Sequence, residues 1–511
     1  MLISKGRVMR AGSDPHDPPV ADILIEGNRI AAVGPNLRET MAETIQGDIQ
    51  VVDASNSLVV PGFVNAHYHS HDVLAKGCIE EAPLETWRLL ALPPQYPKRS
   101  REEIRARTLL GAIECLRSGM TSIQDMVTLF PFDPEHLDIV AEAYRDVGIR
   151  AVVALQYADI RGVDTVPFWR ECFPEEMHKF LSSAAEPDKN SDQLAYMEEK
   201  YLKGGTGHDR LTWALGPSAP ERCTPELIER TIDLSQRYGM SIYTHIYESK
   251  GMALQARQEY QEFDGSLVKR LHKEGMLGPR LNLAHSVWLL PEEIELLAET
   301  NTNVVINPLS NMKLKSGIPP ILQLQEAGIT MGLGCDNCSC SDAQNMFQAM
   351  KLYCLIAAIS DPDPGPDQAV NAFNAATVGG ASTAGLGNEL GVIEPGYLAD
   401  LVLLNLKDPS FVPLNSAVRQ LVYTEGGRGI QSVIVNGEIV IRDGVLKAMD
   451  EEAIIQEVME IMPEFMKDYC QVAERAERLK PFIEKAHADL GRGCRNEPNV
   501  HRPVSFCSAI K

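Results

Sequence analysis

Three histidines, His67, His69 and His71, occupy alternate positions directly after an apolar run. In a β-strand, residues i, i+2 and i+4 point to the same face, so the three imidazoles would share one side of the chain. Neutral imidazole is a common ligand of Zn²⁺ and Fe²⁺. The spacing therefore permits a metal site, although three histidines on a polar strand edge would give the same pattern.

Further residues of metal-binding type follow strand-like apolar runs much later in the chain. His245 and His285 each lie near the end of such a run, and Asp336 ends the last one. Three imidazoles and one carboxylate form a suitable ligand set for Zn²⁺ or Fe²⁺, and a water molecule completes a catalytic site of this kind. These residues can meet only if the fold brings the ends of the runs together.

The strand-like runs recur eight times and alternate with amphipathic stretches such as 100–119 and 224–239. Strands that alternate with helices indicate parallel βα units, and eight such units indicate a closed (β/α)₈ TIM barrel. Barrels of this type hold their chemistry at the carboxyl ends of the strands. The runs cover residues 58–69, 121–126, 150–159, 211–220, 240–248, 281–289, 303–311 and 330–337.

The two ends of the chain share a different sequence pattern, in which short strand-like segments are separated by turns that contain Gly, Asn and Asp. The pieces lie in 2–9, 22–34, 50–63, 391–406 and 430–444. We expect them to pair into a small composite β-sandwich domain. The expected division is 1–60 for its first part, 61–388 for the barrel, 389–447 for its second part and 448–511 for a C-terminal helical extension.

Composition narrows the class of protein. The 511 residues are 44% hydrophobic and carry a net charge of −22, without a cluster of Lys and Arg, so we expect neither nucleic acid nor an anionic membrane as a partner. A small neutral or cationic ligand fits the negative net charge better. The start of the chain lacks a signal-like apolar core, and the 11 cysteines are scattered and odd in number. These features favour a cytoplasmic protein with reduced thiols.

These residues resemble the motifs of the amidohydrolase superfamily, in the branch that holds triazine hydrolases, cytosine and guanine deaminases and S-adenosylhomocysteine deaminases. The resemblance covers about residues 1–445 and implies one divalent metal ion, zinc or alternatively iron, bound by His67, His69, His245 and Asp336. It also implies a small-molecule substrate and a homo-oligomer. The motifs are Pro61-Gly62-Phe63-Val64-Asn65-Ala66-His67-Tyr68-His69, Thr244-His245-x-x-Glu248, Ala284-His285, Asn307-Pro308-x-Ser310-Asn311, Gly334-x-Asp336 and Pro395-Gly396-x-x-Ala399-Asp400-Leu401.

The same residues suggest a hydrolytic mechanism. A bound divalent ion lowers the pKa of water from about 15.7 towards about 7, which makes hydroxide available as a nucleophile. Asp336 would accept the water proton, and His285 would orient the nucleophile or stabilise the oxyanion. Glu248 would protonate a ring nitrogen and then the leaving group.

A proton donor at position 248 favours ammonia or an amine as the leaving group, so we expect hydrolytic deamination of an aminated N-heterocycle. One alternative is hydrolysis of an amide, carbamate, urea or halogenated triazine at the same site. The other alternative is a catalytically inactive binding protein.

Several side chains are candidate contacts for the substrate. Trp87 would stack on a planar ring or pack in the core, and Gln156 ends the third strand-like run. Asn311 would touch the substrate or brace its loop. His71 is interpreted as a substrate contact or a hydrogen-bonded neighbour, and not as a metal ligand. The full set is Trp87, Gln156, Glu248, His285, Asn311 and His71.

Two positions differ from the deaminases of this branch that act on nucleosides. Ser218 stands where those enzymes usually carry histidine, and Gln95 stands where they usually carry an acidic residue. The resemblance assigns both positions to ribose binding, so the differences weigh against an adenosine-type substrate. A free heterocycle or a triazine-like compound fits better.

A run of cysteines lies next to Asp336, with Cys335, Cys338 and Cys340 in a Cys-x-x-Cys-x-Cys pattern. Such spacing occurs in zinc ribbons and redox motifs. A four-cysteine site needs a second Cys-x-x-Cys, and the sequence contains none. Ordinary buried thiols are the simpler interpretation.

Overall fold

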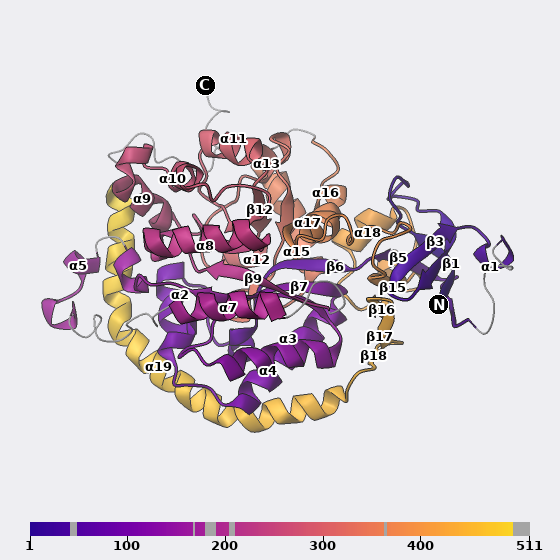
Figure 1. Ribbon diagram of the computed structural model, residues 1–511, viewed down its shortest axis with the longest axis horizontal. Helices are drawn as coiled ribbons and strands as arrows, with labels where there is room; N and C mark the ends of the chain where they lie inside the picture. The colour runs from indigo at the N-terminus through magenta and orange to yellow at the C-terminus, as the bar shows by residue number, and fades with distance from the viewer. Residues whose placement is uncertain (41–48, 167–168, 179–190, 204–209, 362–364, 494–511) are drawn as a thin grey trace.

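The computed structural model describes residues 1–40, 49–166, 169–178, 191–203, 210–361 and 365–493. Two nine-stranded sheets organise these residues. One sheet is parallel and surrounded by helices, and the other pairs strands from both ends of the chain (Figure 1).

The parallel sheet has the order β13-β12-β11-β10-β9-β8-β7-β6-β14. The end strands β13 and β14 are two pieces of one run, separated only by Gly334 and Cys335, and β14 pairs with β6 through Asp336 and Tyr68. The sheet therefore closes on itself, and the predicted (β/α)₈ barrel is confirmed. Its strands are β6 (Phe63–His69), β7 (Met120–Val127), β8 (Arg150–Tyr157), β9 (Leu211–Pro217), β10 (Ile242–Ile246), β11 (Leu281–His285), β12 (Asn303–Ile306), β13 (Met331–Leu333) and β14 (Asp336–Asn337).

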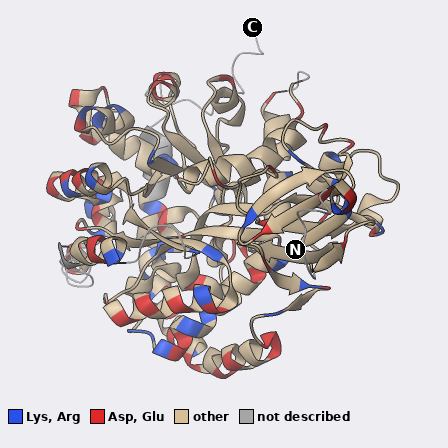
Figure 2. Cartoon of the chain, turned by 45° about the vertical axis from the view of Figure 1, so that its right-hand side comes forward, with Lys and Arg blue, Asp and Glu red and all other residues tan. Residues whose placement is uncertain are grey.

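Helices cover the outside of the barrel, and local signals fix their ends. The side chain of Ser100 accepts a hydrogen bond from the backbone N–H of Glu103 and caps α3 (Arg101–Arg117). Thr224 caps α8 (Pro225–Tyr238) in the same way, and Gly239, with φ of 73°, ends it. In the view of Figure 2, Lys and Arg alternate with Asp and Glu along the helices at the surface. Other covering helices are α4 (Pro134–Val147), α7 (Ser191–Lys203), α10 (Leu267–Glu274), α11 (Pro291–Glu299), α13 (Ile321–Glu326) and α15 (Met346–Ser360).

The second sheet joins the two ends of the chain, as the sequence predicts. Its order is β18-β17-β16-β15-β5-β1-β2-β3, and β4 pairs with β1. The antiparallel pair β5 and β15 joins the N-terminal and C-terminal strands, and a separate buried cluster that includes Ile23, Leu401 and Ile434 packs against them. The first predicted barrel run, 58–69, is divided, because β5 belongs to this sheet. The strands are β1 (Leu2–Val8), β2 (Val20–Glu26), β3 (Arg29–Gly34), β4 (Val51–Asp53), β5 (Ser57–Pro61), β15 (Leu401–Asn405), β16 (Ile430–Val435), β17 (Glu438–Arg442) and β18 (Val445–Leu446).

The C-terminal segment forms one long helix, α19 (Glu451–Gly493), which curves around the barrel in yellow in Figure 1. It packs against α3 and against α2 (Leu84–Ala91), α5 (Trp169–Cys172) and α9 (Lys250–Glu259). The hydroxyl of Tyr469 donates to the carbonyl of Cys78 at 2.7 Å, and Asp468 forms an ion pair with Arg99. Within the described residues, no helix has the length and apolarity that a membrane crossing requires.

Candidate active site

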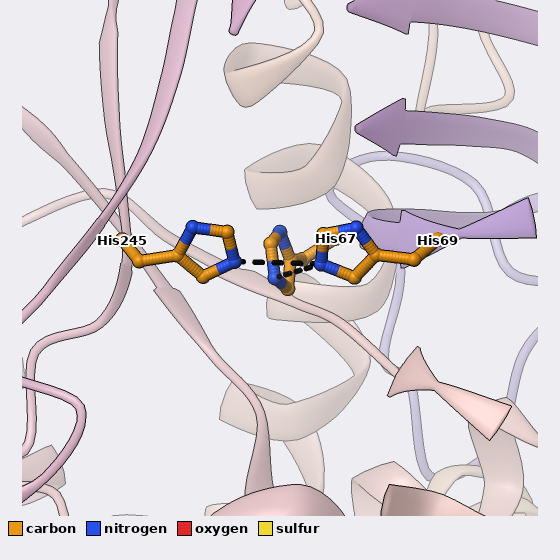
Figure 3. Close-up of side chains that lie close together, drawn as sticks. All are labelled: His67, His69 and His245. Carbon is orange, nitrogen blue, oxygen red and sulfur yellow. Dashed lines mark hydrogen bonds between the residues drawn. The ribbon is translucent and has the colours of Figure 1, made fainter. Parts of the chain in front are cut away.

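Four histidines and one aspartate converge at the carboxyl ends of the barrel strands. The Nε2 atoms of His67 and His69, both on β6, are 3.2 Å apart, and Nε2 of His245 on β10 lies 3.4 Å from that of His69 (Figure 3). Oδ1 of Asp336 lies 3.4 Å from Nε2 of both His67 and His69. His285, the last residue of β11, completes the cluster. The structure thus brings together every residue that the sequence suggests as a metal ligand.

The hydrogen bonds of the rings show that the cluster fits a cation. The Nδ1 atom of His69 donates to the carbonyl of Met126 at 2.7 Å, and Nδ1 of His245 donates to that of Ser218 at 2.5 Å. Their Nε2 atoms therefore carry lone pairs that face each other without a proton between them, which is repulsive unless a cation lies there. Nε2 of His285 is also buried without a hydrogen-bond partner. A divalent metal ion would satisfy Nε2 of His69 and of His245, and a water molecule beside it would satisfy Nε2 of His285.

The protonation states agree with this arrangement. Burial lowers the pKa of His67 to about 4 and holds the pKa of His245 well below its usual value. Both rings are therefore neutral at pH 7, as a metal ligand must be. Burial alone would raise the pKa of Asp336, but its contacts with His67 and His69 hold that pKa well below the usual range. His67 and His245 thus supply neutral imidazoles, and Asp336 supplies an ionised carboxylate. The contact of His69 with Asp336 raises the pKa of that ring despite its burial.

Unusual backbone conformations occur in the cluster and next to Glu248. Tyr247, His285 and Asp336 have positive φ angles of 48°, 73° and 62°. Non-glycine residues in this region are strained and persist only where surrounding contacts hold them. The side chain of Asn65 accepts from the backbone N–H of Cys335 at 3.0 Å, which fixes the chain beside Asp336. A Cβ atom at Gly334 would lie 2.6 Å from Cβ of His67, so this close approach requires glycine.

Glu248 lies beside His285 at the cluster. Its Oε2 is 3.7 Å from Nε2 of His285, which in turn is 3.8 Å from Oδ2 of Asp336. Burial and the negative charge of Asp336 raise the pKa of Glu248 to about 8. A carboxyl in this environment keeps its proton near neutral pH and can donate it.

A cavity opens beside the cluster. The predicted substrate contacts His71, Trp87 and Gln156 line it, together with Glu248 and His285. Asn311 does not. It lies behind His285, with its Oδ1 2.8 Å from Nδ1 of that ring. The sequence left two roles open for Asn311, and the structure places it as a bracing residue.

His71 lines the cavity but lies outside the metal-competent groups of the described residues. The backbone N–H of Thr128 donates to Nδ1 of His71 at 3.2 Å, so the ring proton sits on Nε2. Nε2 lies 3.3 Å from the side-chain amide of Asn337. Burial holds the pKa of His71 well below its usual value, so the ring is neutral.

Sequence reasoning missed several residues that shape the site. Asp72 accepts from the backbone N–H groups of Cys338 and Ser339, both at 3.0 Å, which ties the short helix η1 (Ser70–Ala75) after β6 to α14 (Cys338–Ser341) after β14. Asp125 accepts from the backbone N–H of Ser70 at 2.9 Å. Asp125 lies near the end of a predicted barrel strand, and only that position in the sequence could have indicated that it belongs to the site. Two arginines of the cavity wall, Arg88 and Arg222, carried no such signal.

The cysteines beside Asp336 do not join the cluster. Burial raises the pKa of the Cys335, Cys338 and Cys340 thiols. A thiol must lose its proton to bind a metal or react, so these residues favour the interpretation as buried thiols. In the described part of the chain, no metal-competent group includes them.

Comparison with known proteins identifies the family, because the model of the amidohydrolase family matches residues 58–440. The chain belongs to the amidohydrolase family. This amidohydrolase is therefore a hydrolase that acts on carbon–nitrogen bonds.

Individual relatives match along most of their length. The chain is 32% identical over 434 residues to a 5'-deoxyadenosine deaminase of Methanothermobacter thermautotrophicus, covering 85% of this chain and 92% of the relative. It is 31% identical over 442 residues to a 5-methylthioadenosine/S-adenosylhomocysteine deaminase of Pyrococcus furiosus, covering 86% and 96%. Among solved structures, an adenosine deaminase from Xanthomonas campestris with bound zinc superimposes with a TM-score of 0.77 at 26% identity, covering 93% of this chain and 98% of that one.

Proposed function

We propose that this amidohydrolase catalyses the hydrolytic deamination of an aminated N-heterocycle with one zinc ion held by His67, His69, His245 and Asp336. The observation that carries the proposal is the position of Glu248, a buried carboxyl that lines the same cavity as the imidazole cluster. Amine leaving groups need a proton, and Glu248 supplies the donor. The zinc bound in the similar adenosine deaminase structure supports the choice of metal.

Each side chain then has a defined task. When bound, the divalent ion supplies Lewis acidity that brings the pKa of a water molecule towards about 7. Asp336 accepts a proton from the attacking water, because its carboxylate is ionised and its Oδ2 faces His285. His285 offers its Nε2 lone pair to position that water. Glu248 protonates the ring nitrogen, regains a proton from Asp336 and passes it to the departing amine. The hydroxyl of the intermediate returns the last proton to Glu248 as the amine leaves, so that all the proton transfers balance inside the cavity.

The choice of heterocycle draws on two lines of support. The relatives carry names of deaminases of adenosine derivatives, which favours a purine-like ring. Ser218 and Gln95, however, replace the residues assigned to ribose binding. Gln95 turns towards α19, where its backbone and side-chain oxygens both accept from Arg475 at 2.8 Å. We therefore propose that the ring and its amine are recognised while the ribose contacts of those relatives are absent.

The test is ammonia release from a panel of purines, pyrimidines, pterins and triazines by the zinc-loaded protein. We expect ammonia from at least one ring. Glu248→Gln should lose this activity, whereas Glu262→Gln, an exposed acidic residue near α9, should keep it. Cleavage of an anilide or carbamate without ammonia from any ring would show that deamination is wrong. Purified protein that binds no stoichiometric metal and hydrolyses nothing would support the binding-protein alternative.

A further inference from the structure

Two arginines line the cavity next to the imidazole cluster. Arg88 comes from α2, and Arg222 comes from η4 (Pro220–Arg222), the short helix after β9. Neither guanidinium has a carboxylate partner within 4.0 Å among the described residues, unlike the buried Arg107, Arg150 and Arg270. Arg150, for example, forms an ion pair with Asp400 at 3.0 Å.

The hydrogen bonds of Arg222 leave part of its donor set unused. Its Nη1 donates to the hydroxyl of Ser218 at 2.9 Å, and that hydroxyl also accepts from Nε2 of Gln156 at 2.8 Å. The Nε atom of Arg222 is buried and has no hydrogen-bond partner. A guanidinium held at one nitrogen with its Nε edge unpaired is suited to a bidentate oxyanion.

The surrounding charges do not supply that oxyanion. The Glu85 carboxylate accepts from the hydroxyl of Ser249 at 2.6 Å. Glu221 lies near both arginines, but burial raises its pKa, so it tends towards the neutral acid. Burial and the charge of Arg88 lower the pKa of Arg222 to about 10, which leaves it charged at neutral pH. Two like charges side by side in a cavity favour an anionic ligand between them.

We propose that this enzyme selects aminated N-heterocycles that carry an anionic substituent, a carboxylate or a phosphate, which Arg88 and Arg222 bind while the amine faces Glu248. This inference rests on the proposed deamination. It also gives Ser218 a function, because the hydroxyl that replaces the expected histidine holds Arg222 in place. The net charge of −22 by itself favours a neutral or cationic ligand. The two arginines make the electrostatic potential inside the cavity positive, in contrast to the rest of the protein.

The experiment compares matched substrates that differ by one charged group. Suitable pairs are pterin with pterin-6-carboxylate, cytosine with cytosine-5-carboxylate, and adenosine with its 5′-carboxylate. Adenosine 5′-phosphate separates phosphate from carboxylate recognition. For the zinc-loaded enzyme we expect kcat/KM to favour the charged member of a pair by at least about 100-fold, as sites built around unpaired polar groups discriminate strongly.

Variants assign the preference to the arginines. Arg222→Met and Arg88→Met should each reduce the ratio of kcat/KM between charged and neutral members by about tenfold or more, mainly through a higher KM for the charged member. Arg222→Lys should retain part of the ratio, because lysine keeps the positive charge but lacks the paired N–H donors that bind an oxyanion in a bidentate way. Arg230→Met, on the exposed face of α8, should leave both activity and ratio unchanged. An unchanged ratio in both cavity variants would overturn the inference.

A binding measurement separates failure of this inference from failure of the proposed function. Glu248→Gln retains both arginines, and Trp87 in the cavity wall reports ligand binding by fluorescence. If no ring releases ammonia but the charged ligands still bind in an arginine-dependent way, the deamination is wrong and the anion site stands. If ammonia is released equally from both members of every pair, the deamination stands and the anion site is wrong.

Discussion

Asn311 lies behind the ring of His285, with its Oδ1 2.8 Å from Nδ1, and this contact fixes which ring nitrogen faces the cavity. Because an amide oxygen only accepts, Nδ1 carries the proton and Nε2 presents a lone pair between Glu248 and Asp336. Asn311→Ala should therefore lower kcat by about 10- to 100-fold while the zinc content stays unchanged. Steady-state kinetics and metal analysis of the same preparation measure both. Asn56→Ala, in an exposed turn of the second sheet, is the control, and a parallel loss of zinc in Asn311→Ala would contradict this role.

Removing a proposed metal ligand should separate the cluster from other buried histidines. In His67→Ala, one of the facing imidazoles is lost, so we expect less than about a tenth of the zinc of the unchanged protein and activity reduced by at least about 100-fold. His136 on α4 is also buried but lies outside the cluster, so His136→Gln should keep both zinc and activity. The measurement is metal content by mass spectrometry, together with activity before and after dialysis against a chelator. Full activity in His67→Ala would remove this cluster from the mechanism.

The raised pKa of Glu248 predicts a pH-dependent stability of the metal-free protein. The folded protein holds the Glu248 proton up to about pH 8, whereas the unfolded chain releases it near pH 4.5. Between these values the folded state binds more protons, so its free energy of unfolding falls as the pH rises. Glu248→Gln lacks this proton equilibrium and should be more stable than the unchanged protein by roughly 1 to 3 kcal/mol at pH 8, with a smaller difference at pH 5. Urea denaturation of both metal-free proteins at the two pH values tests this, and an identical dependence on pH would contradict it.

The sequence predicts the barrel well because its signals are local and repeated. Each strand is a short apolar run that ends in polar residues, and the ligands sit at those ends, so His67 and Asp336 are identified without knowing their distance. The pairing of Asp336 with Tyr68 closes the barrel. Pairing between residues so far apart in the chain cannot be predicted from the local amino-acid composition. For the same reason Arg88 and Arg222 escape sequence reasoning. In the sequence, each is an ordinary charged residue in a helical segment, and only the three-dimensional fold places it at the cavity.

The C-terminal helix α19 braces one wall of the cavity through Arg475. Its Nη2 donates to both the backbone oxygen and Oε1 of Gln95 at 2.8 Å, in the segment that follows α2 and its cavity residue Trp87. Arg475→Ala should loosen this segment and raise KM by about tenfold, since a hydrogen bond from a charged group contributes about 1.5 kcal/mol, while kcat changes less. Arg478→Ala is the matched control, because Arg478 lies on the exposed face of the same helix. Kinetics on one substrate for both variants make the comparison, and equal KM values in the two variants would show that α19 does not support the cavity through this contact.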